Sequence, residues 1–223
     1  MTHQTTLATL DRVSVVPWLY WLLLPVHRLF LSLFFSSIVI HGSQHLPTQG
    51  PLVLAPKHYS RWDPFVLAVL SVEPLWFMTN ANQFSGLQGW FLPRLGAFPV
   101  DVEHPKPASF RYAIELLKAQ KKLMLFPEGG IVRDQPLRSL KPGLARLVLQ
   151  AQAAASASAA IPIVPIAIRY KPAPVWRSHI TIVIRPSLYA SHFSQSSEKQ
   201  LAQAITAALE ASLLEGLAES QIG

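Results

Sequence analysis

The chain has 223 residues, of which 50% are apolar and only 14% are charged, so it is long enough for one domain with a substantial core. It contains no cysteine, which excludes disulfides, thiolate metal sites and a cysteine acyl-enzyme. The formal net charge of +7 predicts a polyanionic partner, either an anionic membrane surface or a phosphorylated substrate; nucleic acid is not expected, because Lys and Arg are scattered almost singly and no nucleic-acid-binding motif is present.

The first predicted element is an apolar segment at residues 13–40, whose interruptions are Pro17, Pro25 and the pair His27-Arg28. A single spanning helix would place Arg28 near the bilayer centre, at a cost of at least about 2.5–3.5 kcal/mol. Each uninterrupted piece is about a dozen residues long, short of the roughly 20 that a span needs. We therefore predict that residues 1–36 form a broken helical segment that lies in one leaflet as a monotopic anchor. The alternative, an apolar helix packed on the domain's own core, stays open.

After residue 36, short β-rich runs alternate with helical patterns. The predicted strands are residues 37–41, 51–56, 75–79, 98–101, 122–126, 161–168 and 179–185. The predicted helices are residues 64–72, 86–93, 107–120, 141–154 and 197–218. Strands that alternate with helices are typical of an α/β fold with a mainly parallel sheet flanked by helices, which we expect to form one domain over residues 37–223.

Polar residues follow three of these strands directly. His58 follows the strand at 51–56, Asp101 ends the next-but-one strand, and Glu128, Gly129 and Gly130 follow the strand at 122–126. Ligands of open α/β sheets bind outside the carboxyl ends of the strands. The sequence therefore predicts a functional site at this edge of the sheet.

The stretch KHYSRWDP at residues 57–64 places a histidine five positions before an aspartate. A catalytic base and its orienting carboxylate would have this composition. The alternative is an ordinary helix start, because Asp63 followed by Pro64 suits an N-cap and a first helical position. The spacing alone does not decide between the two, and the surrounding motifs must.

These motifs resemble the glycerolipid acyltransferase family, whose best-known members are 1-acylglycerol-3-phosphate acyltransferases. KHYSRWD is similar to the family's H-x4-D motif, LGAFPVD at 95–101 to its second motif, and FPEGG at 126–130 to its FPEG motif. IPIVPIAI at 161–168 resembles the late VP strand, with Pro165 in the proline position. The similarity covers about residues 37–185 in the family's order, which implies acyl transfer from a thioester to an alcohol.

The resemblance implies that His58 is the general base and Asp63 the group that fixes its tautomer. The acceptor hydroxyl would attack the thioester itself, without an acyl-enzyme, and no cofactor or metal is expected beyond the donor, acyl-CoA or acyl-carrier protein. The oxyanion would be held by backbone N–H groups near Gly129 and Gly130, or by a nearby Arg or Lys. Glu128 would hold the glycerol hydroxyls or an ordered basic side chain.

The sequence departs from the family at the basic positions that hold an acceptor phosphate. The position before the histidine is Lys57 where asparagine is common, and Asn80 and Val102 stand where basic residues are common. We expect other cations to replace them on the phosphate, or to bind the donor's phosphopantetheine. The candidates are Arg133, Arg138 and Lys141 in the loop after FPEGG, and Arg94 before the second motif.

The predicted function is transfer of a fatty acyl chain to the free hydroxyl of a lysophospholipid, with 1-acylglycerol-3-phosphate, giving phosphatidic acid, as the first expected acceptor. Two alternatives stay open: acylation of another lysophospholipid or a phosphate-free lipid alcohol, and a non-catalytic lipid-binding protein of the same fold. The intact His58 and Asp63 pair favours an enzyme, because a binder needs neither. The expected partners are membrane lipids and the acyl donor, and the expected location is the cytoplasmic side of a membrane.

Overall fold

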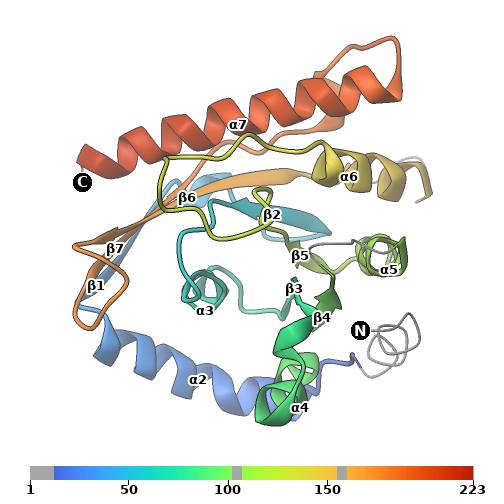
Figure 1. Ribbon diagram of the computed structural model, residues 1–223. Coiled ribbons are helices and arrows are strands. Elements are labelled where there is room, and N and C mark those ends of the chain that lie inside the picture. Colours follow the sequence, from blue (N-terminus) through green and yellow to red (C-terminus); the bar gives the residue numbers. More distant parts are fainter. Residues whose placement is uncertain (1–12, 102–106, 155–159, 223) are drawn as a thin grey trace.

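The computed structural model describes residues 13–101, 107–154 and 160–222. Val102, one of the positions where the sequence departs from the family, lies outside them. Within the described residues, seven strands form one sheet in the order β1-β7-β6-β2-β5-β3-β4 (Figure 1). The strands are β1 (Ser37–His41), β2 (Leu52–Pro56), β3 (Leu75–Asn80), β4 (Ala97–Val100), β5 (Lys122–Met124), β6 (Ile163–Lys171) and β7 (His179–Ile184).

The helices follow the predicted order. They are α2 (Pro17–Phe34), α3 (Asp63–Leu67), α4 (Gly86–Arg94), α5 (Pro107–Lys118), α6 (Gly143–Ala154) and α7 (Glu198–Ile222). The predicted helix at 64–72 is shorter in the structure, where α3 gives way to a 3-10 turn at Ala68–Leu70. The predicted strand at 161–168 is longer and runs on to Lys171.

The sheet is mainly parallel, as predicted, with one reversal. β2, β3, β4, β5 and β6 run in one direction, whereas β7 is antiparallel to β6 and carries β1 parallel to itself. The reversal follows from the short connection at residues 172–178, because a short loop can join only antiparallel neighbours, whereas a parallel pair needs a long crossover. The α/β class predicted from the sequence is thereby confirmed.

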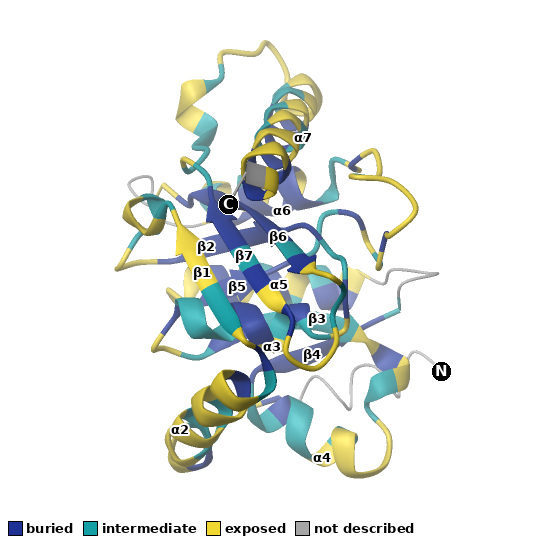
Figure 2. Ribbon diagram, turned by 90° about the vertical axis from the view of Figure 1, so that its left-hand side faces the viewer, coloured by how far each residue is buried: buried dark blue, intermediate teal, exposed yellow. Residues whose placement is uncertain are grey.

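The core lies on both faces of the sheet, because alternate residues of a strand point to opposite faces. In β2, Val53 and Ala55 pack with residues of α5, α6 and α7, whereas Leu52 and Leu54 pack with residues of α2 and α3. Figure 1 shows α7 and α6 above the sheet and α2 below it, and Figure 2 shows the buried strands between these layers.

Helix α2 corrects the expectation of a broken segment. It is one continuous helix of 18 residues, with Pro17 in its first turn and Pro25 inside it. Proline removes one backbone hydrogen bond and bends a helix, but the turns on either side of the exposed Pro25 persist. Only 11% of the helix is buried, so it is not a core helix of the domain. By length and composition α2 could cross a membrane, as could α7, which is 39% buried and packs on β6 and α6.

Candidate active site

His58 and Asp63, which the sequence predicts to act as a pair, are hydrogen-bonded to each other at the carboxyl end of β2. His58 Nδ1 lies 2.9 Å from Asp63 Oδ2, and the histidine side chain is 16% exposed while the aspartate side chain is fully buried. The ring stacks on Phe126, which follows β5, with 3.9 Å between centroids. Because Nδ1 faces the carboxylate, Nε2 is the ring nitrogen left to a substrate. A base held this way keeps one tautomer and one orientation.

Asp63 is not an ordinary helix cap. The cap position of α3 is Trp62, and Asp63 lies in the first turn, where its carboxylate accepts hydrogen bonds from the loop that precedes the helix. Oδ2 accepts hydrogen bonds from the backbone N–H groups of Tyr59 at 2.6 Å and Ser60 at 2.8 Å, and Oδ1 accepts one from the Tyr170 hydroxyl at 2.7 Å. These donors satisfy a buried carboxylate that would otherwise be strongly destabilising, so both of its oxygens are fixed in place.

Glu128 holds the loops of the site together. Its Oε2 accepts from Lys57 Nζ at 2.8 Å and from the Arg138 backbone N–H at 3.0 Å, and its Oε1 accepts from the His58 backbone N–H at 2.9 Å. The Lys57 and Glu128 side chains are 2% and 0% exposed. Of the two roles expected for Glu128, the structure shows the one in which it holds a basic side chain, Lys57, and both of its oxygens accept hydrogen bonds from protein donors.

The loop after β5 is tied to the His58 segment along its length. The Val132 N–H donates to the His58 carbonyl oxygen at 2.9 Å, and Lys57 Nζ donates to the Val132 carbonyl oxygen at 3.0 Å. Gly129 has a φ of +71°, which favours glycine, and its N–H donates to the Phe126 oxygen within the turn. The Gly130 N–H has no hydrogen-bond partner among the described residues, so of the two glycines Gly130 keeps a donor for an oxyanion.

The four predicted cations lie in different surroundings. The Arg133 Nε donates to the carbonyl oxygen of Tyr59 at 3.0 Å, and its guanidinium lies 5.8 Å from the Tyr59 ring centroid. Tyr59 directly follows His58 in the chain. Arg138 and Lys141 are exposed in the same loop. Arg94 stacks on Trp90 of its own helix, with 4.2 Å to the ring centroid. Of the four, Arg133 alone has a side-chain hydrogen bond with the His58 segment in the described part of the chain.

The register of β6 in the sheet shows which of its residues reach the site. Pro165 is buried in the interior of the sheet opposite Ala55, so it packs within the sheet and does not line the site edge. Tyr170, five residues later, reaches the site instead, and sequence reasoning missed it. The signal was present: Val164, Ile166, Ile168 and Tyr170 alternate onto one buried face, and a buried tyrosine hydroxyl needs a partner.

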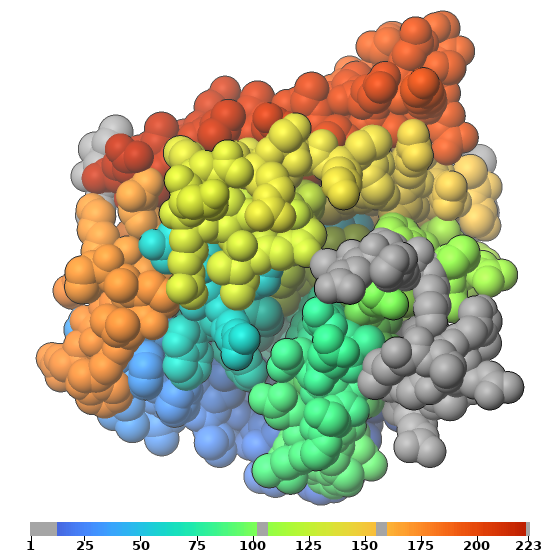
Figure 3. All heavy atoms as spheres, viewed as in Figure 1, coloured from blue at the N-terminus to red at the C-terminus, as the bar shows by residue number. Residues whose placement is uncertain are grey.

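Figure 3 shows the outer surface of this edge. The loop at residues 127–141, in yellow, lies over the cyan segment that follows β2, and the surface is hollowed between these two segments and the green region of α4. The hydrogen bonds between Val132 and His58 and between Lys57 and Glu128 join the two segments. A substrate that reaches His58 would therefore lie against the loop that carries Arg133.

The family known as Acyltransferase matches residues 37–169, more than half of the chain. The 1-acyl-sn-glycerol-3-phosphate acyltransferase of Streptococcus pneumoniae (strain ATCC BAA-255 / R6) is 31% identical over 94 residues, which cover 40% of this chain and 36% of that protein. The protein of the same name from Bacillus subtilis (strain 168) is 30% identical over 107 residues, which cover 46% of this chain and 53% of that protein. The chain thus spans about a third to a half of the length of these relatives.

A solved structure supports the fold independently. The 1-acyl-sn-glycerophosphate (LPA) acyltransferase PlsC from Thermotoga maritima aligns with a TM-score of 0.62 at 19% sequence identity, over 84% of this chain and 75% of that one. The family match starts at β1 and runs to β6, so it contains the His58–Asp63 pair and the Glu128 loop. From this match and the motifs inside it, the chain belongs to the Acyltransferase family.

Proposed function

We propose that the protein is an O-acyltransferase that moves a fatty acyl chain from a thioester donor to the free hydroxyl of a lysophospholipid. The observation that carries the proposal is the 2.9 Å hydrogen bond between His58 Nδ1 and the buried Asp63 carboxylate. A lipid-binding protein needs no oriented base, whereas acyl transfer to an alcohol does. The names of the two sequence relatives support 1-acylglycerol-3-phosphate as the acceptor.

The geometry suits direct transfer. The acceptor oxygen attacks the thioester carbonyl carbon while His58 Nε2 takes the hydroxyl proton, and Asp63 stabilises the imidazolium that forms. The tetrahedral oxyanion would be stabilised by the Gly130 N–H or by a nearby cation. When the intermediate collapses, the C–S bond breaks and the imidazolium returns the proton to the leaving thiolate. The products are the acylated lipid and the free thiol of CoA or acyl-carrier protein, and His58 is again neutral.

A product assay tests the proposal. Purified protein would be incubated with one labelled acyl-CoA, or the acyl-carrier-protein thioester, and with a panel of acceptors: lysophosphatidic acid, other lysophospholipids and monoacylglycerol. We expect a labelled ester with at least one lysophospholipid and release of one thiol per ester. Absence of ester with every donor and acceptor, in a preparation that is folded by circular dichroism, would favour the lipid-binding alternative.

Arg133 is our proposed contact for an acceptor phosphate, because its side chain lies against the His58 segment. It would replace the basic residues that are common in the family at the positions of Asn80 and Val102. A charge-assisted hydrogen bond to phosphate is worth about 1.5–3 kcal/mol. Arg133→Ala is therefore expected to lower kcat/KM for lysophosphatidic acid by roughly 10- to 150-fold and to change little for monoacylglycerol. Both acceptors would be measured by initial rates.

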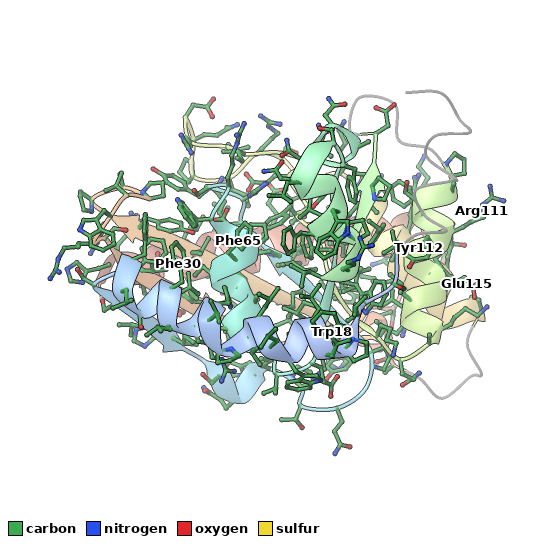
Figure 4. The ribbon with its side chains drawn as sticks, turned by 90° about the horizontal axis from the view of Figure 1, so that it is seen from below. Trp18, Phe30, Phe65, Arg111, Tyr112 and Glu115 are labelled. Carbon is green, nitrogen blue, oxygen red and sulfur yellow. The ribbon has the colours of Figure 1, made fainter. Side chains whose placement is uncertain are left out.

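The matched control is Arg111→Ala, which removes an exposed arginine from α5, away from the site (Figure 4). Arg138, Lys141 and Arg94 would be replaced singly in the same assay. Equal losses on both acceptors for all four site candidates, or no loss for any, would contradict a phosphate site. The phosphate-free alcohol would then be the better acceptor.

We also propose that α2 attaches the protein to one leaflet on the cytoplasmic side of a membrane. The face turned away from the domain is apolar; its exposed members are Trp18, Trp21, Leu22, Val26, Leu29, Phe30 and Leu33. Figure 4 shows α2 lying across the lower face, with Trp18 at one end and Phe30 towards the other. Such a face suits an interfacial helix with aromatic side chains at headgroup level.

Contacts between α2 and the rest of the domain support a helix that lies in the membrane interface and does not span the bilayer. The Val16 N–H, at the start of the helix, donates to the Arg94 oxygen at 3.1 Å, and His27 Nε2 lies 2.9 Å from the Phe65 oxygen near its middle. Just beyond its end, the Ser36 N–H donates to the Ser178 oxygen at 3.0 Å. A spanning orientation would break these contacts or carry the polar backbone of the domain into hydrocarbon, where unsatisfied polar groups are costly.

Replacing outward leucines of α2 tests the anchor. Leu22→Ser and Leu29→Ser are each expected to lower partition onto liposomes with anionic lipid about tenfold or more, because each buried leucine contributes about 1.5–3 kcal/mol. Leu214→Ser is the matched control, an exposed leucine on α7 in the opposite layer (Figure 1). These variants are sharper than deletion of residues 1–36, which also removes Leu31 and Phe35 from the core. Protease protection of both flanks of α2 in vesicles would show a full span and contradict the one-leaflet arrangement.

A further inference from the structure

The Tyr170 hydroxyl is joined to the catalytic pair although no motif pointed to it. Tyr170 lies near the carboxyl end of β6 and is only 5% exposed. Its hydroxyl donates a hydrogen bond of 2.7 Å to Asp63 Oδ1. Asp63 Oδ2 serves His58 and two backbone N–H groups, whereas Oδ1 accepts from no other donor in the described part of the chain. Tyr170 therefore holds the carboxylate oxygen that the loop does not reach.

We propose that Tyr170 is a positioning residue for acyl transfer, which acts through Asp63 by fixing the plane of its carboxylate. This inference rests on the proposed function, because it assigns a role in that same reaction. With both oxygens fixed, the carboxylate cannot rotate about its Cβ–Cγ bond, so Oδ2 stays in line with His58 Nδ1. A pre-oriented acceptor of this kind is what keeps a histidine base in its productive tautomer and orientation.

The surroundings of Tyr170 make the hydroxyl a permanent donor. Its ring lies between Phe35, with 6.2 Å between centroids, and Tyr59, with 6.0 Å. Burial, and then the adjacent Asp63 carboxylate, raise the pKa of the Tyr170 hydroxyl above its ordinary value. The hydroxyl consequently stays protonated wherever the enzyme would work, and it cannot itself serve as the base.

The charged groups that face Tyr170 are few in the described residues. Asp63 is its direct partner, with His58 on the other side of that carboxylate. Arg133 contacts the ring of Tyr59, which is a neighbour of Tyr170, and it has no hydrogen bond to Tyr170 itself in the described part of the chain. Just after α2 the neighbour is Phe35, and from β7 the paired residue is Ile180; neither titrates. A change at the hydroxyl is therefore felt by Asp63 first and by His58 through it.

Removal of the hydroxyl has two consequences that packing alone would not give. The carboxylate gains freedom to rotate, which lowers the fraction of molecules with His58 correctly oriented, so kcat falls. The negative charge of the carboxylate is also less stabilised, because one hydrogen-bond donor is gone, and the carboxylate therefore stabilises a proton on the imidazole more strongly. The base is then lost to protonation at a higher pH, so the acidic limb of the kcat/KM profile moves upward in pH.

The experiment compares Tyr170→Phe with Tyr112→Phe in the full-length protein. Tyr112 is a half-buried tyrosine of α5 (labelled in Figure 4), and its hydroxyl donates to the Val13 oxygen at 3.2 Å. It packs with the core cluster on the other face of the sheet from Tyr170. We expect Tyr170→Phe to lower kcat by roughly 5- to 30-fold with little change in KM. This loss is smaller than that expected for a complete charge-assisted hydrogen bond, because two backbone N–H groups still hold the Asp63 carboxylate. The acidic limb of the Tyr170→Phe profile should move to higher pH, and Tyr112→Phe should show neither effect.

A double-mutant cycle separates action through Asp63 from a general loss of packing. In an Asp63→Asn background, the Tyr170→Phe change should lower the residual kcat by less than about twofold, because the charged partner is already gone. An equal loss in both backgrounds, or a Tyr170→Phe rate equal to wild type, would overturn the inference. A thermal shift of Tyr170→Phe without a change in kcat or in the pH profile would also overturn it. An inactive wild-type protein would instead contradict the proposed function itself.

Discussion

His58→Ala is expected to lower kcat at least 100-fold while folding and membrane binding stay nearly unchanged. The ring is partly exposed and its main contacts are Asp63 and Phe126, so it contributes the base and little packing. General base catalysis contributes about 10²–10⁴-fold, and without the imidazole the acceptor hydroxyl must attack with its proton still attached. Initial rates with the best donor and acceptor from the product assay measure the loss, and circular dichroism and liposome sedimentation measure the properties that should persist.

His192→Ala is the matched control for this variant, because it removes an exposed imidazole outside the site. Its rate should stay within about twofold of wild type. More than about a tenth of wild-type turnover in His58→Ala would mean that a base contributing 10²-fold or more is not at this position. Asp63→Asn should also lower kcat strongly, since the amide cannot stabilise the imidazolium.

Lys57→Met is expected to be the most destabilising single change among the site residues. Its ammonium group lies 2.8 Å from Glu128, both side chains are almost fully buried, and Met fills a similar volume without a charge. Removal of one partner of a buried ion pair typically costs about 3–5 kcal/mol, because the other charge stays buried without compensation. For a chain of this size that corresponds to a fall in Tm of roughly 6–20 °C, measured by thermal or urea unfolding.

The control for this prediction is Lys118→Met, which breaks the exposed pair with Glu115 and should cost less than about 1 kcal/mol. A second variant, Lys57→Met with Glu128→Gln, removes the uncompensated charge. It should be less destabilised than the two single changes added together, since the residues form one unit. Strict additivity, or a Lys57→Met protein as stable as wild type, would show that the buried pair does not hold these loops.

The sequence was informative where the signal is local. The alternation of β-rich runs and helical patterns predicted every strand of the sheet, because a strand buried on one face leaves an alternating pattern and a strand buried on both faces leaves a short continuous apolar run. The rule that parallel strands end at one edge correctly predicts from the sequence that His58 and Glu128 lie together. The continuous course of α2 was not predicted, because a proline in a pattern marks a break more often than a tolerated bend.

The partners of the site residues depended on information that is not local. Tyr170 and Asp63 are 107 positions apart, and Lys57 and Glu128 are 71 apart. Each pairing follows from the order of β2, β5 and β6 in the sheet and from their register, which periodicity does not specify. For this reason Lys57 was visible only as a departure from the family, and Pro165 was assigned to ligand contact although the register places it inside the sheet.

The pairing of β1 with β7 has a consequence for the order of events during synthesis. β1 directly follows α2 and hydrogen-bonds within the sheet only to β7, and Ser37 meets His179 across 142 positions of the chain. At about 5–20 residues per second, a ribosome needs roughly 7–30 s to make the partner after β1 has emerged. Throughout that interval the strand that follows α2 has no partner in the sheet, so it does not yet hold the helix on the domain. A bilayer could therefore receive the helix before the sheet closes, so that the chain would finish folding already in place on a membrane surface.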